Sequence, residues 1–245
     1  PSINYLPLVY KLHKHLYKRN ILSDIIDPGQ DLEKYKLIIL PSMMMIEEEF
    51  AGRLKQAARN GTTILAVGQL GMRDMNDNYL LYPGPDYLSD LFGILIHGGM
   101  YLDSQVGTEE SIWTPDHKHG TVEISVRGTL DGAQVEGRSA KWIGDIENLT
   151  GKVLLTFQED AYNEQLALTE NVYGEGSAVY LAAIDLDVSL ADKVVDYVLS
   201  KAGIAVEYST PLHIEVVKRG EITCVINHTP SEARVHVPGN GKSLV

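Results

Sequence analysis

Short apolar runs that alternate with amphipathic helices constrain this chain more than any other feature of its sequence. Residues 36–40 and 62–67 are apolar runs typical of buried strands. Between them, three glutamates at 47–49 open a helix whose inner face carries Phe50 and Leu54. Strands that alternate with helices at this spacing predict parallel pairing through right-handed crossovers. The sequence therefore predicts an α/β domain with a mainly parallel sheet.

Other segments have equally local signals. Residues 5–18 place apolar side chains at steps of three and four, which predicts an amphipathic helix, and residues 21–26 form a β-rich run that predicts a buried strand. Pro85 suits the first position of a helix that Gly93 ends. Ser189 and Asp192 form a capping-box pair ahead of a further helix.

The later part of the chain is predicted to be mainly extended. We expect residues 94–158 to be β and irregular, with strands at 121–126 and 152–157. Residues 167–172 and 177–184 flank a glycine-containing turn, which predicts a hairpin that returns to the main sheet. Residues 214–218 and 223–227 alternate like two antiparallel strands. The sequence thus predicts a domain over residues 1–207 and the start of a truncated β domain over 208–245.

Composition excludes several classes of protein. The 33 acidic and 21 basic residues give a formal charge of -12 without clustered Lys or Arg, so nucleic acid is not an expected partner. No apolar run approaches the roughly 18 to 20 residues of a membrane helix, so we expect a soluble protein with no membrane partner. One cysteine, Cys224, excludes an internal disulfide framework and favours a reducing, cytoplasmic location. The chain opens at Pro1 without an initiator Met, as a fragment would.

The turn after the run 62–67 has the layout of a nucleophile elbow, in which a tight turn raises one side chain above a sheet. It resembles the elbow of class I glutamine amidotransferases, which carry a cysteine nucleophile there. In this chain Gln69 holds that position between Gly68 and Gly71. A carboxamide is not a nucleophile near neutral pH, so we expect a structural turn without covalent catalysis.

Other polar groups are weaker candidates. We interpret them as structural, and predict no catalytic, cofactor-binding or metal-binding residue. Asp185 and Asp187 follow a predicted strand and more simply serve the entry turn and cap of the next helix. Cys224 is expected to be a small buried hydrophobe. The remaining candidates are the pairs His213 with Glu215, His13 with His15, and His117 with His119 beside Asp116.

Residues 72–85 form a long polar loop rich in turn formers. A loop of this length is unusual in a compact domain unless it is functional. We therefore expect it to act in a site or in a contact between molecules, and Tyr79 and Leu81 are the apolar residues we assign to that contact.

An ordered set of short segments resembles the trimerisation domain of glycoside hydrolase family 42 β-galactosidases. The segments are residues 35–41 (YKLIILP), 82–85 (YPGP), 91–94 (LFGI) and 170–176 (ENVYGEG). The match runs in order over most of residues 1–207. Residues 214–219 (IEVVKR) and 225–229 (VINHT) are similar to the start of the small C-terminal β domain of those enzymes.

The resemblance implies a flavodoxin-like, amidotransferase-like three-layer domain that holds three subunits together. In that family the catalytic glutamates belong to an N-terminal barrel, which alone takes about 250 residues and has no counterpart in this chain. The resemblance therefore implies a non-catalytic module whose partners are two further copies and the barrel of a retaining β-galactosidase acting on terminal β-D-galactosides. It also implies that a first strand ahead of residues 5–18 is absent, which leaves the sheet one strand short or open to a strand of another chain. The alternative is a degenerate amidotransferase-like domain that binds a small ligand at the sheet edge near Gln69.

Overall fold

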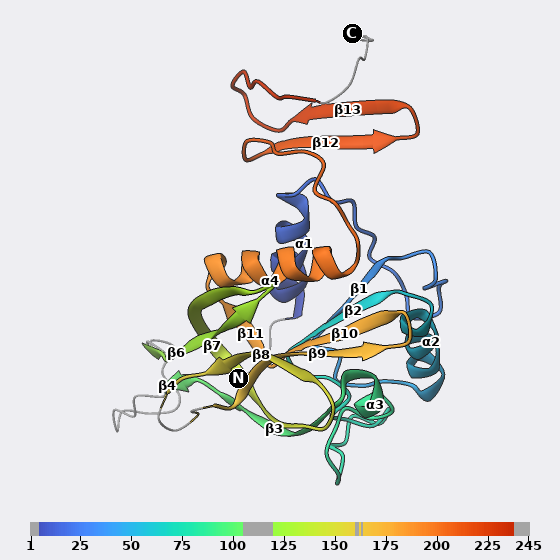
Figure 1. The fold of residues 1–245 in the computed structure, drawn as a ribbon, viewed down its shortest axis with the longest axis vertical. Coiled ribbons are helices and arrows are strands. Elements are labelled where there is room, and N and C mark those ends of the chain that lie inside the picture. The colour runs from blue at the N-terminus through green and yellow to red at the C-terminus, as the bar shows by residue number, and fades with distance from the viewer. Residues whose placement is uncertain (1–4, 105–119, 160–161, 163, 238–245) are drawn as a thin grey trace.

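The computed structural model describes residues 5–104, 120–159, 162 and 164–237. Within them, a nine-stranded mixed sheet forms the centre of the molecule and curls upon itself (Figure 1). Its strands, in spatial order, are β1 (Leu37–Pro41), β2 (Thr63–Val67), β10 (Gly176–Leu181), β9 (Leu166–Tyr173), β8 (Lys152–Phe157), β6 (Glu123–Leu130), β7 (Ala133–Asn148) and β11 (Ala183–Leu186), with β3 (Ile94–Tyr101) paired to the second half of β7. The other elements are the helices α1 (Tyr5–Tyr17), α2 (Glu48–Arg59), α3 (Ser89–Phe92) and α4 (Val188–Lys201), and the strand pairs β4 (Asp103–Ser104) with β5 (Gly120–Thr121) and β12 (Ile214–Arg219) with β13 (Ile222–Asn227).

The predicted α/β class is confirmed, but the expectation of a mainly parallel sheet is corrected. Parallel pairing joins only β1, β2 and β10 among the described strands, and all other pairs of the large sheet are antiparallel. Tight turns explain the difference. Gly174, at φ 66°, turns β9 into β10, and Asp131 and Gly132, both with positive φ, turn β6 into β7. Such short connections join antiparallel neighbours, whereas parallel neighbours need a crossover.

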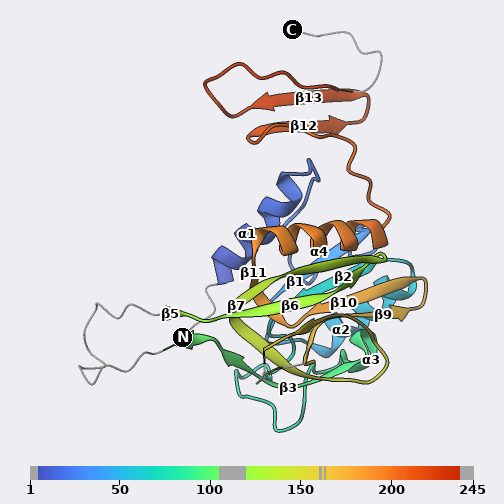
Figure 2. The same ribbon diagram turned by 60° about the vertical axis from the view of Figure 1, so that its left-hand side comes forward.

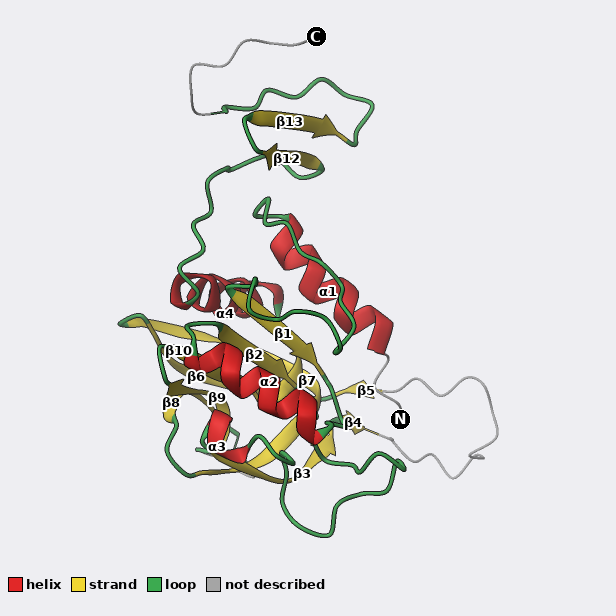
Figure 3. Cartoon of the chain, turned by 90° about the vertical axis from the view of Figure 1, so that its right-hand side faces the viewer, coloured by secondary structure: helices red, strands yellow, loops and turns green. Residues whose placement is uncertain are grey.

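Helices cover both faces of the parallel part of the sheet (Figure 3). On β1, Leu37 and Ile39 pack with a cluster from α1 and α4 that includes Leu16 and Leu199. Ile38 alternates with them and is buried in the main core on the opposite face, where α2 packs against β2, β9 and β10. The expected helices at 5–18 and 47–59 and the strands at 36–40 and 62–67 are therefore confirmed within a residue or two.

The strand predicted over residues 21–26 is wrong. The segment is irregular: Leu22 and Ile25 are 58% and 89% exposed, and only Ile21 and Ile26 at its ends pack against the core. Among the described strands β1 pairs only with β2, so residues 21–26 form no ladder with the free edge of β1. An apolar run without a ladder partner cannot satisfy its backbone as a strand.

Two helix starts also differ from expectation. The capping box expected from Ser189 and Asp192 does not cap α4. Asp187 does, in the cap role expected of the aspartates: its carboxylate accepts one hydrogen bond from the Leu190 N–H at 3.0 Å and another from the Arg138 N–H of β7 at 2.5 Å. One side chain thus ties the helix to the sheet. The helix expected from Pro85 begins only at Ser89, although Gly93 ends it in the predicted left-handed conformation.

The β12–β13 hairpin stands apart from the large sheet, beyond one end of α1 (Figure 2). Both strands and their antiparallel pairing agree with the sequence prediction. Asn20 links the hairpin to α1: its Oδ1 accepts a hydrogen bond from the Val216 N–H at 2.7 Å, and its amide donates to Thr210 Oγ1 at 3.0 Å. Cys224 on β13 was expected to be buried and is exposed, because no described element covers the face of the hairpin that carries it.

Acid is expected to loosen α1. Lys11 of α1 and Lys141 of β7 bind the Asp185 carboxylate at 2.5 and 3.0 Å. Burial alone would raise the pKa of Asp185, but the hydrogen bonds and positive charges of the two lysines have the larger combined effect and hold this pKa below the ordinary 3.8. A carboxylate whose pKa is lower in the folded than in the unfolded protein stabilises the fold at pH values above its unfolded pKa. This stabilisation is lost as the pH falls through the pKa of the folded protein. We expect the urea midpoint to hold between pH 7 and about pH 5 and to fall below pH 3.8.

The same titration in two variants tests the assignment. Asp185→Asn should lower the midpoint at pH 7 and flatten its fall in acid. Asp145→Asn removes an exposed carboxylate that has no ion pair among the described residues, and should leave the profile of the parent protein. A parent-like profile for Asp185→Asn would contradict the role of this ion pair.

Candidate functional site

The site is built from the turn that follows β2. Every residue of β2 is buried, and Gly68 and Gly71 then turn the chain at φ 73° and 52°. The Gly68 carbonyl accepts a hydrogen bond from the buried Tyr180 hydroxyl at 2.7 Å, and a Cβ at Gly68 would lie 2.7 Å from Ile184. The sheet thus fixes the turn and requires glycine there.

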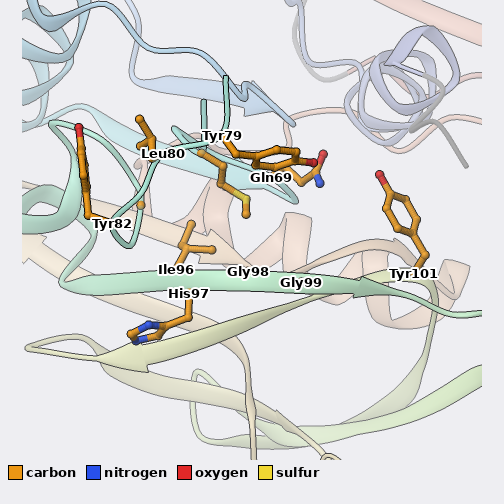
Figure 4. A pocket seen from close by; sticks show the side chains of 11 residues that line it. Gln69, Tyr79, Leu80, Tyr82, Ile96, His97, Gly98, Gly99 and Tyr101 are labelled. Carbon is orange, nitrogen blue, oxygen red and sulfur yellow. The ribbon is translucent and has the colours of Figure 1, made fainter. Parts of the chain in front are cut away.

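Gln69 occupies the position between these glycines. It is 4% exposed, and it lines a cavity that Figure 4 shows from close by. Among the described residues its side-chain amide has no hydrogen-bond partner. The geometry agrees with the prediction of a tight turn that presents one side chain, and that side chain is an amide without nucleophilic chemistry.

The loop over residues 72–85 is held in one shape by its own polar groups. The Asp74 carboxylate accepts hydrogen bonds from the backbone N–H groups of Asn76 and Asn78, both at 2.9 Å, and the bond from the Asn78 side chain is the main cause of its lowered pKa. Arg73 pairs with Asp77 at 2.6 Å. These contacts hold the loop in one conformation, so the loop is pre-organised.

The same loop exposes apolar side chains. Leu81 is fully exposed, and the Tyr79 ring is 59% exposed although the Arg73 guanidinium lies 4.2 Å from its centroid. Met75 and Tyr82 are also more than half exposed. A cluster of large apolar side chains on a fixed loop is typical of a surface that binds another protein.

The cavity lies between this loop and β3 and has a volume of about 250 Å³. Gly84 joins the two walls, because its N–H donates to the Ile96 carbonyl at 2.9 Å and its carbonyl accepts from the Ile96 N–H at 2.6 Å. The residues that line the cavity are Gln69, Met72, Tyr79, Leu80, Tyr82, Gly84, Ile96, His97, Gly98, Gly99 and Tyr101.

The structure places the two aspartates after β10 in structural roles. Asp185 forms ion pairs with Lys11 and Lys141, and Asp187 caps α4. Their carboxylates are bound by different groups and do not flank an open cleft. This agrees with the interpretation that they serve the entry of the helix.

The histidine pairs are not brought together. His13 contacts Ser23, whereas His15 contacts Asp192 at 2.7 Å. Glu215 pairs with His228 at 3.1 Å rather than with His213, which lies in the turn before β12. His117, His119 and Asp116 lie outside the described residues.

In the described part of the chain, no three His, Cys, Asp or Glu side chains gather in a way that could hold a metal ion. None of the described helices combines the length and the apolarity needed to cross a lipid bilayer.

Sequence reasoning identified Gln69 and the loop but missed the β3 wall of the cavity. That wall consists of residues 96–99 and Tyr101. The glycine pair at 98–99, with Tyr101 two residues after it, was the local signal for it. The antiparallel pairing of β3 with β7, far along the chain, is what places this wall opposite Gln69.

Comparisons with known proteins identify the family. The family model described as "Beta-galactosidase trimerisation domain" matches residues 1–205. The β-galactosidase BgaB of Geobacillus sp. (strain Y412MC61) is 30% identical over 244 residues, which are 97% of this chain and 33% of that protein. The chain therefore spans about a third of the curated relatives that it matches.

Solved structures agree with this match. The β-galactosidase from Bacillus circulans sp. alkalophilus is 27% identical, with a TM-score of 0.74 over 89% of this chain and 30% of the other. The β-galactosidase from Rahnella sp. R3 has a TM-score of 0.80 over 97% of this chain and 34% of the other, and at 21% identity it supports the fold alone. The chain thus belongs to the trimerisation domain family of glycoside hydrolase family 42 β-galactosidases.

Proposed function

We propose that this chain is the assembly module of a homotrimeric β-galactosidase and has no catalytic group of its own. Residues 1–207 form the trimerisation domain, with a flavodoxin-like, amidotransferase-like ancestry, and residues 208–245 begin a small second β domain. The family match over residues 1–205 and the separate β12–β13 hairpin support this division. The turn at Gln69 supports the absence of covalent chemistry, because an amide replaces the nucleophile.

The observation that carries the proposal is the ordered apolar loop over residues 72–85. Burying Leu81 and the rings of Tyr79 and Tyr82 against a neighbouring subunit would remove a large apolar area from water. Because the loop is already fixed by Asp74 and Arg73, little conformational entropy is lost when the neighbour docks.

A closed ring of three needs two different patches on each subunit, since its interfaces are head-to-tail. The loop supplies one patch. The outer face of α1 supplies the other, because Tyr5, Leu6 and Tyr10 are each at least half exposed there.

We propose the activity of the whole protein by family membership. The relatives that this chain matches are β-galactosidases, and the chain spans about a third of their length. The whole protein is then a retaining enzyme that hydrolyses terminal β-D-galactosides in the cytoplasm. Its catalytic glutamates lie in a barrel that contacts this module and is not part of the chain.

The solution mass measured by light scattering on a sizing column tests the assembly. Three chains of 27.1 kDa give about 81 kDa, the mass expected for a closed ring. A mass of 27.1 kDa at every protein concentration would overturn self-assembly by this chain. Turnover of a galactoside or of glutamine by the purified chain would contradict the assignment of a non-catalytic module.

A further inference from the structure

The walls of the cavity beside Gln69 carry amide, aromatic, aliphatic and glycine groups. None of the lining residues is Lys, Arg, Asp or Glu. Charged groups nearby have their own partners: Arg73 pairs with Asp77, and Asp86 accepts a hydrogen bond from the Tyr82 hydroxyl at 3.2 Å. His97 is bound to Glu147 at 2.9 Å, and Figure 4 shows its ring on the other side of β3 from Gln69. The cavity therefore matches a neutral ligand.

Gln69 supplies the specific polar group. Gln69 is 96% buried, and its side-chain amide borders the cavity. This amide has no hydrogen-bond partner among the described residues. A carboxamide offers one acceptor oxygen and two N–H donors. Because the amide borders the cavity, a ligand with hydroxyl groups, which both donate and accept, can hydrogen-bond to its oxygen and its N–H groups.

The other walls suit a compact ring. The aromatic side chains of Tyr79, Tyr82 and Tyr101 provide flat faces, and Ile96 points into the cavity (Figure 4). A Cβ at Gly98 would meet nothing within 4 Å, so a ligand can approach the backbone of β3 there, whereas the space beside Gly99 is filled by the Trp142 indole. A volume of about 250 Å³ lies just below the range of sites for drug-sized ligands, roughly 300 to 1,000 Å³, and suits a single sugar ring.

We propose that this cavity is a binding site for a neutral monosaccharide, held by the Gln69 amide and the tyrosine faces. The site shares Tyr79 and Tyr82 with the proposed subunit contact, so the solution mass of each variant is measured beside its sugar binding. The turn at residues 68–71 and the bridge between Gly84 and Ile96 form it within one chain.

Calorimetric titration of the full chain with D-glucose and D-galactose tests the proposal. We expect at least one neutral sugar to bind with a dissociation constant in the millimolar range. Glucuronate and glucosamine present a negative and a positive charge on the same ring, and should bind at least about tenfold more weakly because the walls offer no counter-charge. Failure of both neutral sugars to bind at about 100 mM, or preference for a charged analogue, would overturn the proposal.

Variants locate the site. Gln69→Leu keeps the size of the side chain and removes its hydrogen bonds, so it should weaken sugar binding about tenfold. Gln134→Leu changes an exposed glutamine of β7 outside the cavity and should leave binding unchanged. Tyr82→Ala removes one aromatic face at the exposed loop, where folding is not at risk, and should weaken binding at least threefold. Binding that survives both Gln69→Leu and Tyr82→Ala would place the sugar elsewhere and refute the site.

Discussion

Replacement of both Tyr79 and Leu81 by aspartate is expected to lower the solution mass from about 81 kDa to 27.1 kDa, while the free energy of unfolding changes by no more than about 1 kcal/mol. Leu81 is fully exposed, so its replacement removes no contact within the subunit. Tyr79 loses its stacking with Arg73, which accounts for the permitted change in stability. In the assembled trimer, however, each interface would bury two new carboxylates that have no positively charged partner. The free-energy cost of removing these charges from water is expected to dissociate the trimer.

The matched control is Val188→Asp. Val188 is a large exposed apolar residue at the start of α4, away from the loop, where an acidic side chain suits the positive end of the helix dipole. This variant should keep the mass of the parent. A double loop variant that remains at 81 kDa would remove residues 72–85 from the interface, and loss of the ring in Val188→Asp would move the interface toward α4.

Gly128→Ala is expected to destabilise the fold by about 3 kcal/mol or more, or to prevent folding. Gly128 lies in β6 between β7 and β8, and a Cβ there would lie 2.0 Å from the Leu154 carbonyl oxygen and 2.8 Å from the Leu155 Cα. Both atoms are backbone, so no side chain can move aside. Strand β8 would have to shift, and with it the pairing that connects the parallel part of the sheet to β6 and β7.

Gly52→Ala is the same chemical change with the opposite expected sign. A Cβ at Gly52 meets nothing within 4 Å, and the residue lies inside α2, where alanine is favoured over glycine by about 0.5 to 1 kcal/mol. Urea unfolding of both variants beside the parent measures the two effects. A Gly128→Ala variant as stable as the parent would contradict the β6–β8 register.

Sequence reasoning succeeded where a signal is contained within one segment. The amphipathic stripe of α2, the apolar run of β2 and the hairpin of β9 and β10 each carry their own pattern, and each lies where it was expected. It failed where a partner decides the outcome. Residues 21–26 have the composition of a strand but form no ladder. The capping box expected from Ser189 and Asp192 gives way to Asp187, whose carboxylate also reaches Arg138 on β7.

The candidate site divides in the same way. The glycines around Gln69 and the turn formers of residues 72–85 are local, so the sequence by itself determined the turn, the loop and the amide that replaces a nucleophile. Tertiary structure alone decided that the sheet is mixed, that the loop is rigid with Leu81 outward, and that β3 closes a cavity opposite Gln69. The physical reason is that hydrogen-bond ladders and burial join residues far apart in the chain, as β3 is joined to β7, and no periodicity within a single segment records which distant strand will be its neighbour.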